Sequence, residues 1–128
     1  MNLLLDTHSF LWFIAGSSQL SRPARTLIED PTHQPFLSVA SLWEMAIKVS
    51  LGKLNVGPPF ETFMAQQLEL NGIALLPIQL RHVAVVTTLP FHHRDPFDRL
   101  LIAQAQIEQM PLLSGDTAFD AYAVTRLW

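Results

Sequence analysis

Short apolar runs alternate along the chain with longer segments whose apolar residues recur every three or four positions. The apolar runs cover residues 2–5, 36–39, 73–76 and 111–114, and a fifth short segment covers residues 124–128. Runs of this length suit strands, whereas the longer periodic segments suit helices that pack on one face. Strands alternating with helices predict an α/β fold with a central, mainly parallel sheet of four to five strands.

Local start and stop signals divide the remaining chain into helices. We predict helices over residues 9–15, 21–29, 41–51, 60–70, 80–88 and 96–108, and a short helical turn over residues 117–122. Ser21 and Ser41 stand where an N-cap is expected, and Ser41 forms a capping-box pattern with Glu44. No repeat or linker interrupts the pattern, so residues 1–128 are predicted to form a single domain.

Composition narrows the class of protein. The chain has 128 residues, of which 49% are hydrophobic and 15% are charged, and this is typical of a folded domain with its own core. The absence of cysteine excludes disulfides and thiolate metal sites. Asp6 interrupts the first apolar run before a signal peptide could form, and no stretch is long enough to span a bilayer. We therefore expect a cytoplasmic protein with no membrane association.

Two acidic residues directly follow predicted strands. Asp6 follows the strand at 2–5, and Asp116 lies two residues past the strand at 111–114. The carboxyl ends of parallel strands meet at one edge of the sheet, where ligands bind, so both carboxylates should lie there. Each precedes a threonine, Thr7 or Thr117, whose hydroxyl could support a carboxylate or bind a water. The alternatives are a helix N-cap for Asp6 and an ordinary turn for Asp116.

The segment HHRDPFDRLLIAQA holds two acids for which we predict different roles. Asp95 precedes Pro96 and occupies the position of an N-cap for the helix at 96–108. Asp98 instead shares a helix face with the apolar residues three, four and seven positions further on, Leu101, Ile102 and Ala105. That face packs inward, so Asp98 should point toward the other acids rather than into solvent.

Glu44 has Ile47 and Leu51 on its own helix face, which is a weaker form of the same argument. Four carboxylates at one rim, from Asp6, Glu44, Asp98 and Asp116, would raise one another's pKa values unless a divalent cation lay among them. Ligation by oxygen alone favours Mg²⁺ or Mn²⁺ over zinc. A metal held by carboxylates suits the hydrolysis of phosphodiester bonds.

Four segments of the chain together resemble a known family. LLLDTH, SVASLWEMAIK, HHRDPFDRLLIAQA and LLSGDTAF match, in order and spacing, the PIN-domain ribonucleases, specifically the VapC-type toxins of bacterial toxin–antitoxin pairs. The resemblance spans essentially the whole chain. It implies a three-layer α/β/α fold and cleavage of RNA that depends on Mg²⁺ or Mn²⁺. It also implies a homodimer and a cognate antitoxin whose tail covers the site.

The family pattern carries over onto individual residues. The resemblance implies that Asp6, Glu44, Asp98 and Asp116 are the catalytic and metal-binding residues. Asp95 is a secondary candidate, because a variant of the family has a doubled Asp in this motif.

Other residues near the acidic motif have more than one interpretation. Arg94 and Arg99 flank the acids and are candidates for contact with RNA. His92 and His93 have no third nitrogen or thiol ligand nearby, so we predict a surface loop rather than a metal site.

Two other functions remain open at this stage. One is a catalytically silent PIN-like module that binds RNA or protein. The other is a haloacid-dehalogenase-type phosphohydrolase, which needs a second Asp at the position of His8.

Overall fold

The fold consists of twelve short elements in a computed structural model that describes residues 1–128. In chain order they are β1 (Asn2–Leu5), α1 (Thr7–Ala15), α2 (Arg22–Glu29), β2 (Gln34–Ser38), α3 (Val39–Ser50), α4 (Phe60–Leu70), β3 (Ala74–Leu76), α5 (Leu80–Val86), α6 (Pro96–Glu108), β4 (Leu112–Leu113), the 3-10 helix η1 (Thr117–Ala121) and β5 (Arg126–Leu127). The five strands form one sheet in the order β3-β2-β1-β4-β5, and every neighbouring pair is parallel. The predicted parallel sheet is confirmed.

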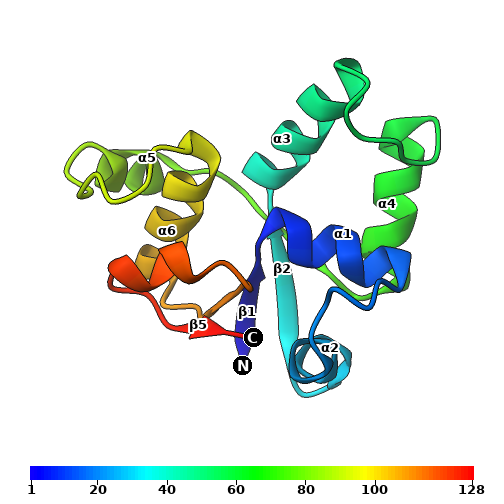
Figure 1. Cartoon of the computed structure of the whole chain (residues 1–128), viewed down its shortest axis with the longest axis horizontal. Coiled ribbons are helices and arrows are strands. Elements are labelled where there is room, and N and C mark those ends of the chain that lie inside the picture. The colour runs from blue at the N-terminus through cyan, green and yellow to red at the C-terminus, as the bar shows by residue number, and fades with distance from the viewer.

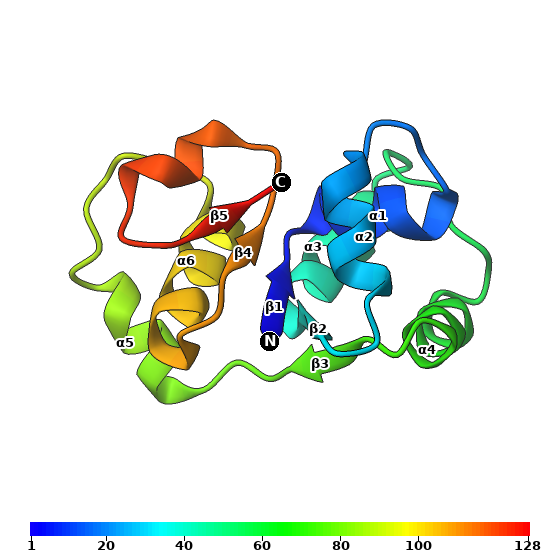
Figure 2. The ribbon, with the colours of Figure 1, turned by 90° about the horizontal axis from the view of Figure 1, so that it is seen from below.

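Helices cover both faces of the sheet (Figures 1 and 2). Successive residues of a strand point to opposite faces, so Leu4 and Leu5 of β1 enter two different cores. Leu4 packs in a core with residues of α6 and η1, whereas Leu5 packs in a core with residues of α1, α2, α3 and α4. Both leucines are fully buried. The structure is therefore the three-layer α/β/α arrangement expected from the sequence.

The helix α6 begins and ends where the sequence predicts. One oxygen of Asp95, Oδ1, accepts hydrogen bonds from the backbone N–H groups of Phe97, at 2.8 Å, and Asp98, at 3.1 Å. Pro96 occupies the first turn, where a missing N–H has no cost. The predicted N-cap role of Asp95 is confirmed, and Asp98 is left in the first turn of the helix.

The start of α3 differs from the prediction. Ser38, rather than Ser41, caps this helix, and its hydroxyl oxygen accepts from the N–H of Ala40 at 3.0 Å. The strand β2 ends at Ser38, so the chain passes from strand to helix with no intervening loop. Val39 is therefore helical rather than part of the strand. Ser41 lies buried inside α3, and the predicted capping box with Glu44 was wrong.

The remaining boundaries are close to those predicted. The helix α4 matches the predicted range, and α5 ends two residues early, at Val86. The strands β3, β4 and β5 are each shorter than predicted, and β5 forms one edge of the sheet as expected. None of the helices combines the length and apolar character needed to cross a membrane.

Candidate active site

Asp6 lies at the carboxyl edge of the sheet, held from two sides. Its Oδ1 atom accepts from the N–H of Ser9 at 2.7 Å, which makes it the N-cap of α1. Its Oδ2 atom accepts from the hydroxyl of Ser114, which follows the neighbouring strand β4, at 2.5 Å. Asp6 and Ser114 are both buried. Capping and a place at the sheet edge, which the sequence offered as alternatives for Asp6, therefore hold together.

Glu44 reaches the same edge from α3, which contacts both α1 and α6. Its carboxylate accepts a hydrogen bond from the hydroxyl of Thr7 at 2.6 Å, and Nζ of Lys48 lies 3.3 Å from its other oxygen. The hydroxyl of Ser41 lies 3.0 Å from that of Thr7. Thr7 thus supports a carboxylate as predicted, and the carboxylate is that of Glu44.

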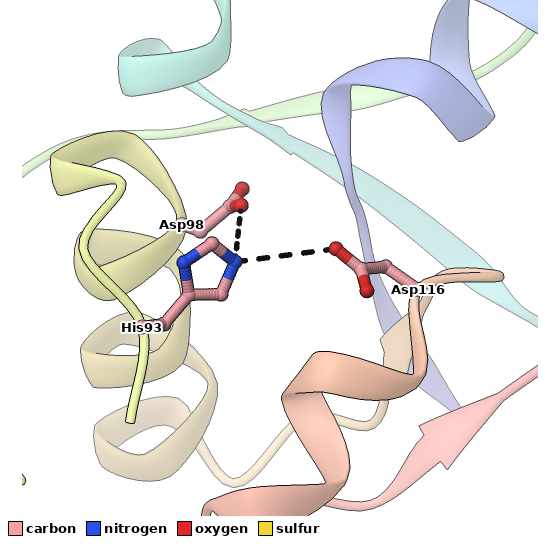
Figure 3. Close-up of side chains that lie close together, drawn as sticks. All are labelled: His93, Asp98 and Asp116. Carbon is pink, nitrogen blue, oxygen red and sulfur yellow. Dashed lines mark ion pairs between the residues drawn. The ribbon is translucent and has the colours of Figure 1, made fainter. Parts of the chain in front are cut away.

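His93 and Asp98, from the loop before α6 and the first turn of that helix, lie beside Asp116, which follows β4 (Figure 3). The Nε2 atom of His93 lies 3.0 Å from Oδ2 of Asp98 and 4.0 Å from Oδ2 of Asp116. One donor atom from each residue lies within 4.8 Å of the other two, a spacing that could hold a metal ion. His93 lies in the loop before α6, as predicted, but its side chain is only 19% exposed and is turned toward Asp98.

The pKa of the Asp98 carboxyl group is affected by the charge of every other acid in the motifs. Burial and the negative charges of neighbouring acids raise its pKa to about 7; those acids are, in decreasing order of effect, Asp95, Glu44, Asp6 and Asp116. A carboxylate so placed is stabilised by a nearby cation. The donor set is dominated by carboxylate oxygens, which suits a hard divalent cation such as Mg²⁺ or Mn²⁺. The residues present therefore fit the metal that the family pattern implies.

Asp116 is the most exposed of the four acids. Its side chain is 50% exposed, and its Oδ1 accepts from the N–H of Ala118 at the start of η1. The N–H of Asp116 donates to the hydroxyl oxygen of Ser114 at 3.0 Å. Thr117 is exposed and its hydroxyl makes no hydrogen bond within the protein, so it supports no carboxylate here, and its binding of a water stays a prediction. Ser114 supports the carboxylate of Asp6 instead, and its place between strand and acid was the signal that sequence reasoning missed.

Two of the four acids, Asp6 and Asp116, line a cavity of about 320 Å³. Its lining residues are Asp6, His8, Trp12, Gln19, Gly115, Asp116 and Trp128. A larger apolar groove of about 680 Å³ lies between α1 and residues 54–58, away from the acids. Of these two cavities, only the smaller, polar one is lined by acids of the motif set.

The two arginines beside the motif differ in their surroundings. The guanidinium group of Arg99 is buried and donates to the backbone carbonyl oxygens of Pro90, Leu89, Val86 and His93, at 2.8 to 3.4 Å. It has no free face to offer to RNA, so that prediction was wrong for Arg99. Arg94 is exposed and forms no side-chain hydrogen bond or ion pair, and its contact with RNA stays a prediction.

Comparison with known proteins agrees with this arrangement. The model of the PIN domain family matches residues 3–124. The chain belongs to the PIN domain family. The match covers every acid of the site, from Asp6 to Asp116, so the carboxyl edge of the sheet is part of this PIN domain rather than an addition to it. No curated protein matches the chain by sequence.

Solved structures share the fold of this PIN domain at low sequence identity. VapBC2 from Rickettsia felis, bound to a DNA fragment from its promoter, has a chain with 14% identity and a TM-score of 0.72, covering 99% of this chain and 98% of that one. A chain of VapBC-1 from nontypeable Haemophilus influenzae has 15% identity and a TM-score of 0.68, and the match covers 99% of this chain and 97% of that one. A chain of FitAcB from Neisseria gonorrhoeae has 18% identity and a TM-score of 0.65, and the match covers 98% of this chain and 96% of that one.

Proposed function

We propose that this PIN domain is a metal-dependent endoribonuclease that hydrolyses phosphodiester bonds of RNA. The observation that carries the proposal is the convergence of carboxylates from separate segments on Asp98, whose pKa their charges and burial raise to about 7. Asp6, Asp98 and Asp116 form no ion pair with a lysine or arginine, although Glu44 lies beside Lys48, whereas a purely structural acid such as Asp120 is paired with Arg126. Membership of the PIN domain family supports the same conclusion.

We propose that Asp6, Asp98, Asp116 and Glu44 hold Mg²⁺ or Mn²⁺. When bound, such a metal lowers the pKa of a water molecule and neutralises charge on the phosphate. Ser114 and Thr7 orient two of the carboxylates by donating hydroxyl protons to Asp6 and Glu44. One oxygen of Asp95 already accepts hydrogen bonds from two backbone N–H groups. We therefore propose only a secondary role in metal binding for Asp95.

The test is cleavage of a structured RNA by the purified protein with Mg²⁺ or Mn²⁺. Cleavage that stops with EDTA and in an Asp6→Asn variant supports the proposal. Asn at this position can still accept the N–H of Ser9, so the cap of α1 is retained while the charge is lost. Cleavage that survives both changes would contradict the proposed mechanism.

We also propose that the protein is the toxin of a toxin–antitoxin pair and acts in the cytoplasm as a homodimer. The toxin role is supported by a chain of the same fold in a toxin–antitoxin complex from Klebsiella pneumoniae, at 16% identity and a TM-score of 0.66. The homodimer and the cytoplasmic location are proposed from the family resemblance alone. The cognate antitoxin would then be its protein partner. Expression in bacteria tests the toxin role: the wild type alone should arrest growth, and the Asp98→Asn variant should not. Unimpaired growth with the wild type would contradict it.

Two other functions have less support. A catalytically silent PIN-like module would be expected to lack acids at the site, whereas all four are present and clustered around Asp98. The family match argues against a haloacid-dehalogenase-type phosphohydrolase.

A further inference from the structure

Three aromatic rings lie beside the acids at the carboxyl edge of the sheet. His8 and Trp12 are four residues apart and therefore share one face of α1, and their ring centroids are 5.6 Å apart. Trp128 directly follows β5, and its ring centroid lies 6.0 Å from that of Trp12. Both distances lie in the range of favourable aromatic contacts. Two segments that are distant in the sequence thus form one aromatic cluster.

The position of the Trp128 ring depends on a glycine. Gly115 directly precedes Asp116, and a Cβ atom at Gly115 would lie 2.9 Å from Cε2 of Trp128. Any larger residue would therefore push the ring away. The end of β5 is fixed as well, because the N–H of Ser114 donates to the carbonyl oxygen of Leu127 at 3.0 Å. The ring of Trp128 is thus held against the backbone that carries Asp116.

All three rings line the cavity of about 320 Å³ that Asp6 and Asp116 also line. Gln19 is a further lining residue, and its exposed side-chain amide makes no hydrogen bond within the protein. Cavities that bind small ligands have volumes of about 300 to 1,000 Å³, so this one lies at the small end of the range. It combines aromatic rings, an unpaired amide and two carboxylates.

The lining of the cavity favours a nucleobase as its occupant. Proteins hold single-stranded RNA by stacking its bases on aromatic side chains, because every base has a flat π-face. The amide of Gln19 can both donate to and accept from the edge of a base. No aliphatic side chain lines this cavity, whereas the groove of about 680 Å³ is lined mostly by apolar residues. An apolar side chain of a partner protein therefore fits the groove better than the cavity.

We propose that Trp12 and Trp128 form a stacking site for one unpaired base of the RNA, next to the phosphodiester bond at Asp6 and Asp116. The proposal rests on the proposed function, because it names how that same site holds its RNA. A base that stacks here fixes the position of the RNA backbone relative to the carboxylates. A base that is paired and stacked inside a duplex cannot enter the cavity.

Tryptophan fluorescence tests the stacking without any cleavage. The chain has three tryptophans, so Trp43→Phe leaves Trp12 and Trp128 as the only ones. This variant, combined with Asp98→Asn to prevent cleavage, is titrated in Mg²⁺ with a single-stranded RNA of eight uridines. The anisotropy of a dye-labelled copy of the RNA measures binding. We expect tryptophan emission to fall as the RNA binds. RNA that binds without changing the emission, or that does not bind, would overturn the proposal.

Substitution of the rings should lower the affinity for the same RNA, measured in the Asp98→Asn protein. Trp12→Leu and Trp128→Leu keep an apolar side chain against the core but remove the ring, and each should weaken binding by at least about five-fold. Trp12→Phe should recover most of the affinity. Trp43→Leu is the matched control, because that ring is 62% exposed, packs on Phe97 and does not line the cavity. It should change the affinity by less than about two-fold.

An RNA backbone of the same length without bases shows whether the rings act on a base. It should bind the Asp98→Asn protein more weakly than the RNA does, and Trp12→Leu should not weaken its binding further. An equal loss for both ligands would overturn the proposal. Unchanged RNA affinity in both leucine variants would also overturn it, in favour of a protein side chain in the cavity. A wild type that binds RNA through these rings but does not cleave it would contradict the proposed function and leave the stacking site intact.

Discussion

The hydroxyl of Thr7 lies 2.6 Å from a carboxylate oxygen of Glu44, and this hydrogen bond joins the first turn of α1 to the middle of α3. Thr7 is 5% exposed and Glu44 is 9% exposed. A buried carboxylate that loses its donor keeps the full cost of its desolvation. The pair therefore stabilises the packing of two helices and also orients one acid of the proposed site.

Replacing Thr7 with Val removes this hydrogen bond while nearly preserving the shape of the side chain. We expect a loss of about 1 to 2 kcal/mol in the free energy of unfolding, measured by urea denaturation. Thr7→Ser keeps the hydroxyl and should retain most of the stability. Thr117→Val is the matched control, because that hydroxyl is exposed and unbonded, and we expect a change below about 0.5 kcal/mol. Equal effects of Thr7→Val and Thr117→Val would refute the assigned role of Thr7.

Arg99 is predicted to act on stability rather than on RNA binding. Arg99→Ala should lower the free energy of unfolding by about 3 kcal/mol, because four backbone carbonyls lose a charged donor. Arg99→Lys should recover little of this, since an ammonium group cannot reproduce the planar fork of donors. The measurement is chemical denaturation of the metal-free protein.

The exposed Arg94 is the matched control for Arg99. Arg94→Ala should change the free energy of unfolding by less than about 0.5 kcal/mol. If Arg94 contacts a phosphate, the same change should weaken RNA binding and lower its salt dependence by about one charge. A stable Arg99→Ala variant with weakened RNA affinity would reverse the roles assigned to the two arginines.

The raised pKa of Asp98 predicts how the stability of the metal-free protein depends on pH. The folded state holds this proton up to about pH 7, whereas in the unfolded chain the group titrates near 3.8. Stability from this group is therefore fully present below pH 3.8 and is lost as the pH rises toward 7. Burial is the largest cause of the shift, and the nearby acids add to it.

Asp98→Asn isolates this contribution. At pH 8 in EDTA, the variant should be more stable than wild type by about 2 kcal/mol, after a discount for solvent screening. At pH 4 the difference should be small. Melting temperatures measured across this range provide the comparison, and a melting temperature of Asp98→Asn below that of wild type at pH 8 would contradict the clustering of charge around Asp98.

Mutations of Asp95 and Asp98, the two acids of HHRDPFDRLLIAQA, should have different effects, the first on stability and the second on cleavage. Asp95→Ala removes the N-cap of α6 and should lower the free energy of unfolding by about 1 kcal/mol. Asp95→Asn retains a cap oxygen and should restore stability. Asp98→Asn should instead lower the rate of RNA cleavage by about 100-fold or more. A larger loss of cleavage in Asp95→Asn than in Asp98→Asn would exchange the proposed roles.

Much of the fold follows from periodicity and from local signals in the sequence. The apolar run before Asp6 marks a buried strand, and Pro96 after Asp95 marks the start of a helix. The parallel direction of the strands then follows from the alternation of strands and helices. The start of α3 could not be located in this way, because Ser38 and Ser41 are both good caps and only the end of β2 decides between them.

The acids of the site and the support from Thr7 were within reach of the sequence, but the other supports were not. Asp6 and Asp116 follow strands that pair with their carboxyl ends together. The hydrogen bond from the N–H of His93 to the hydroxyl of Tyr122 joins residues 29 positions apart and leaves no local pattern. Arg99 resembles an exposed basic residue in the sequence, and only the folded loop reveals the carbonyl groups that surround its guanidinium.

The most direct measurement is the initial rate of RNA cleavage as a function of Mg²⁺ concentration for wild type, Asp98→Asn and Asp30→Asn. Asp30 is a half-exposed acid at the end of α2, outside the proposed site, and its replacement controls for the loss of one negative charge. We predict saturable, Mg²⁺-dependent cleavage by wild type and by Asp30→Asn. For Asp98→Asn we predict a cleavage rate at least about 100-fold lower than that of wild type. Equal rates for all three proteins, or cleavage that does not depend on Mg²⁺, would contradict a metal-dependent nuclease site built on these carboxylates.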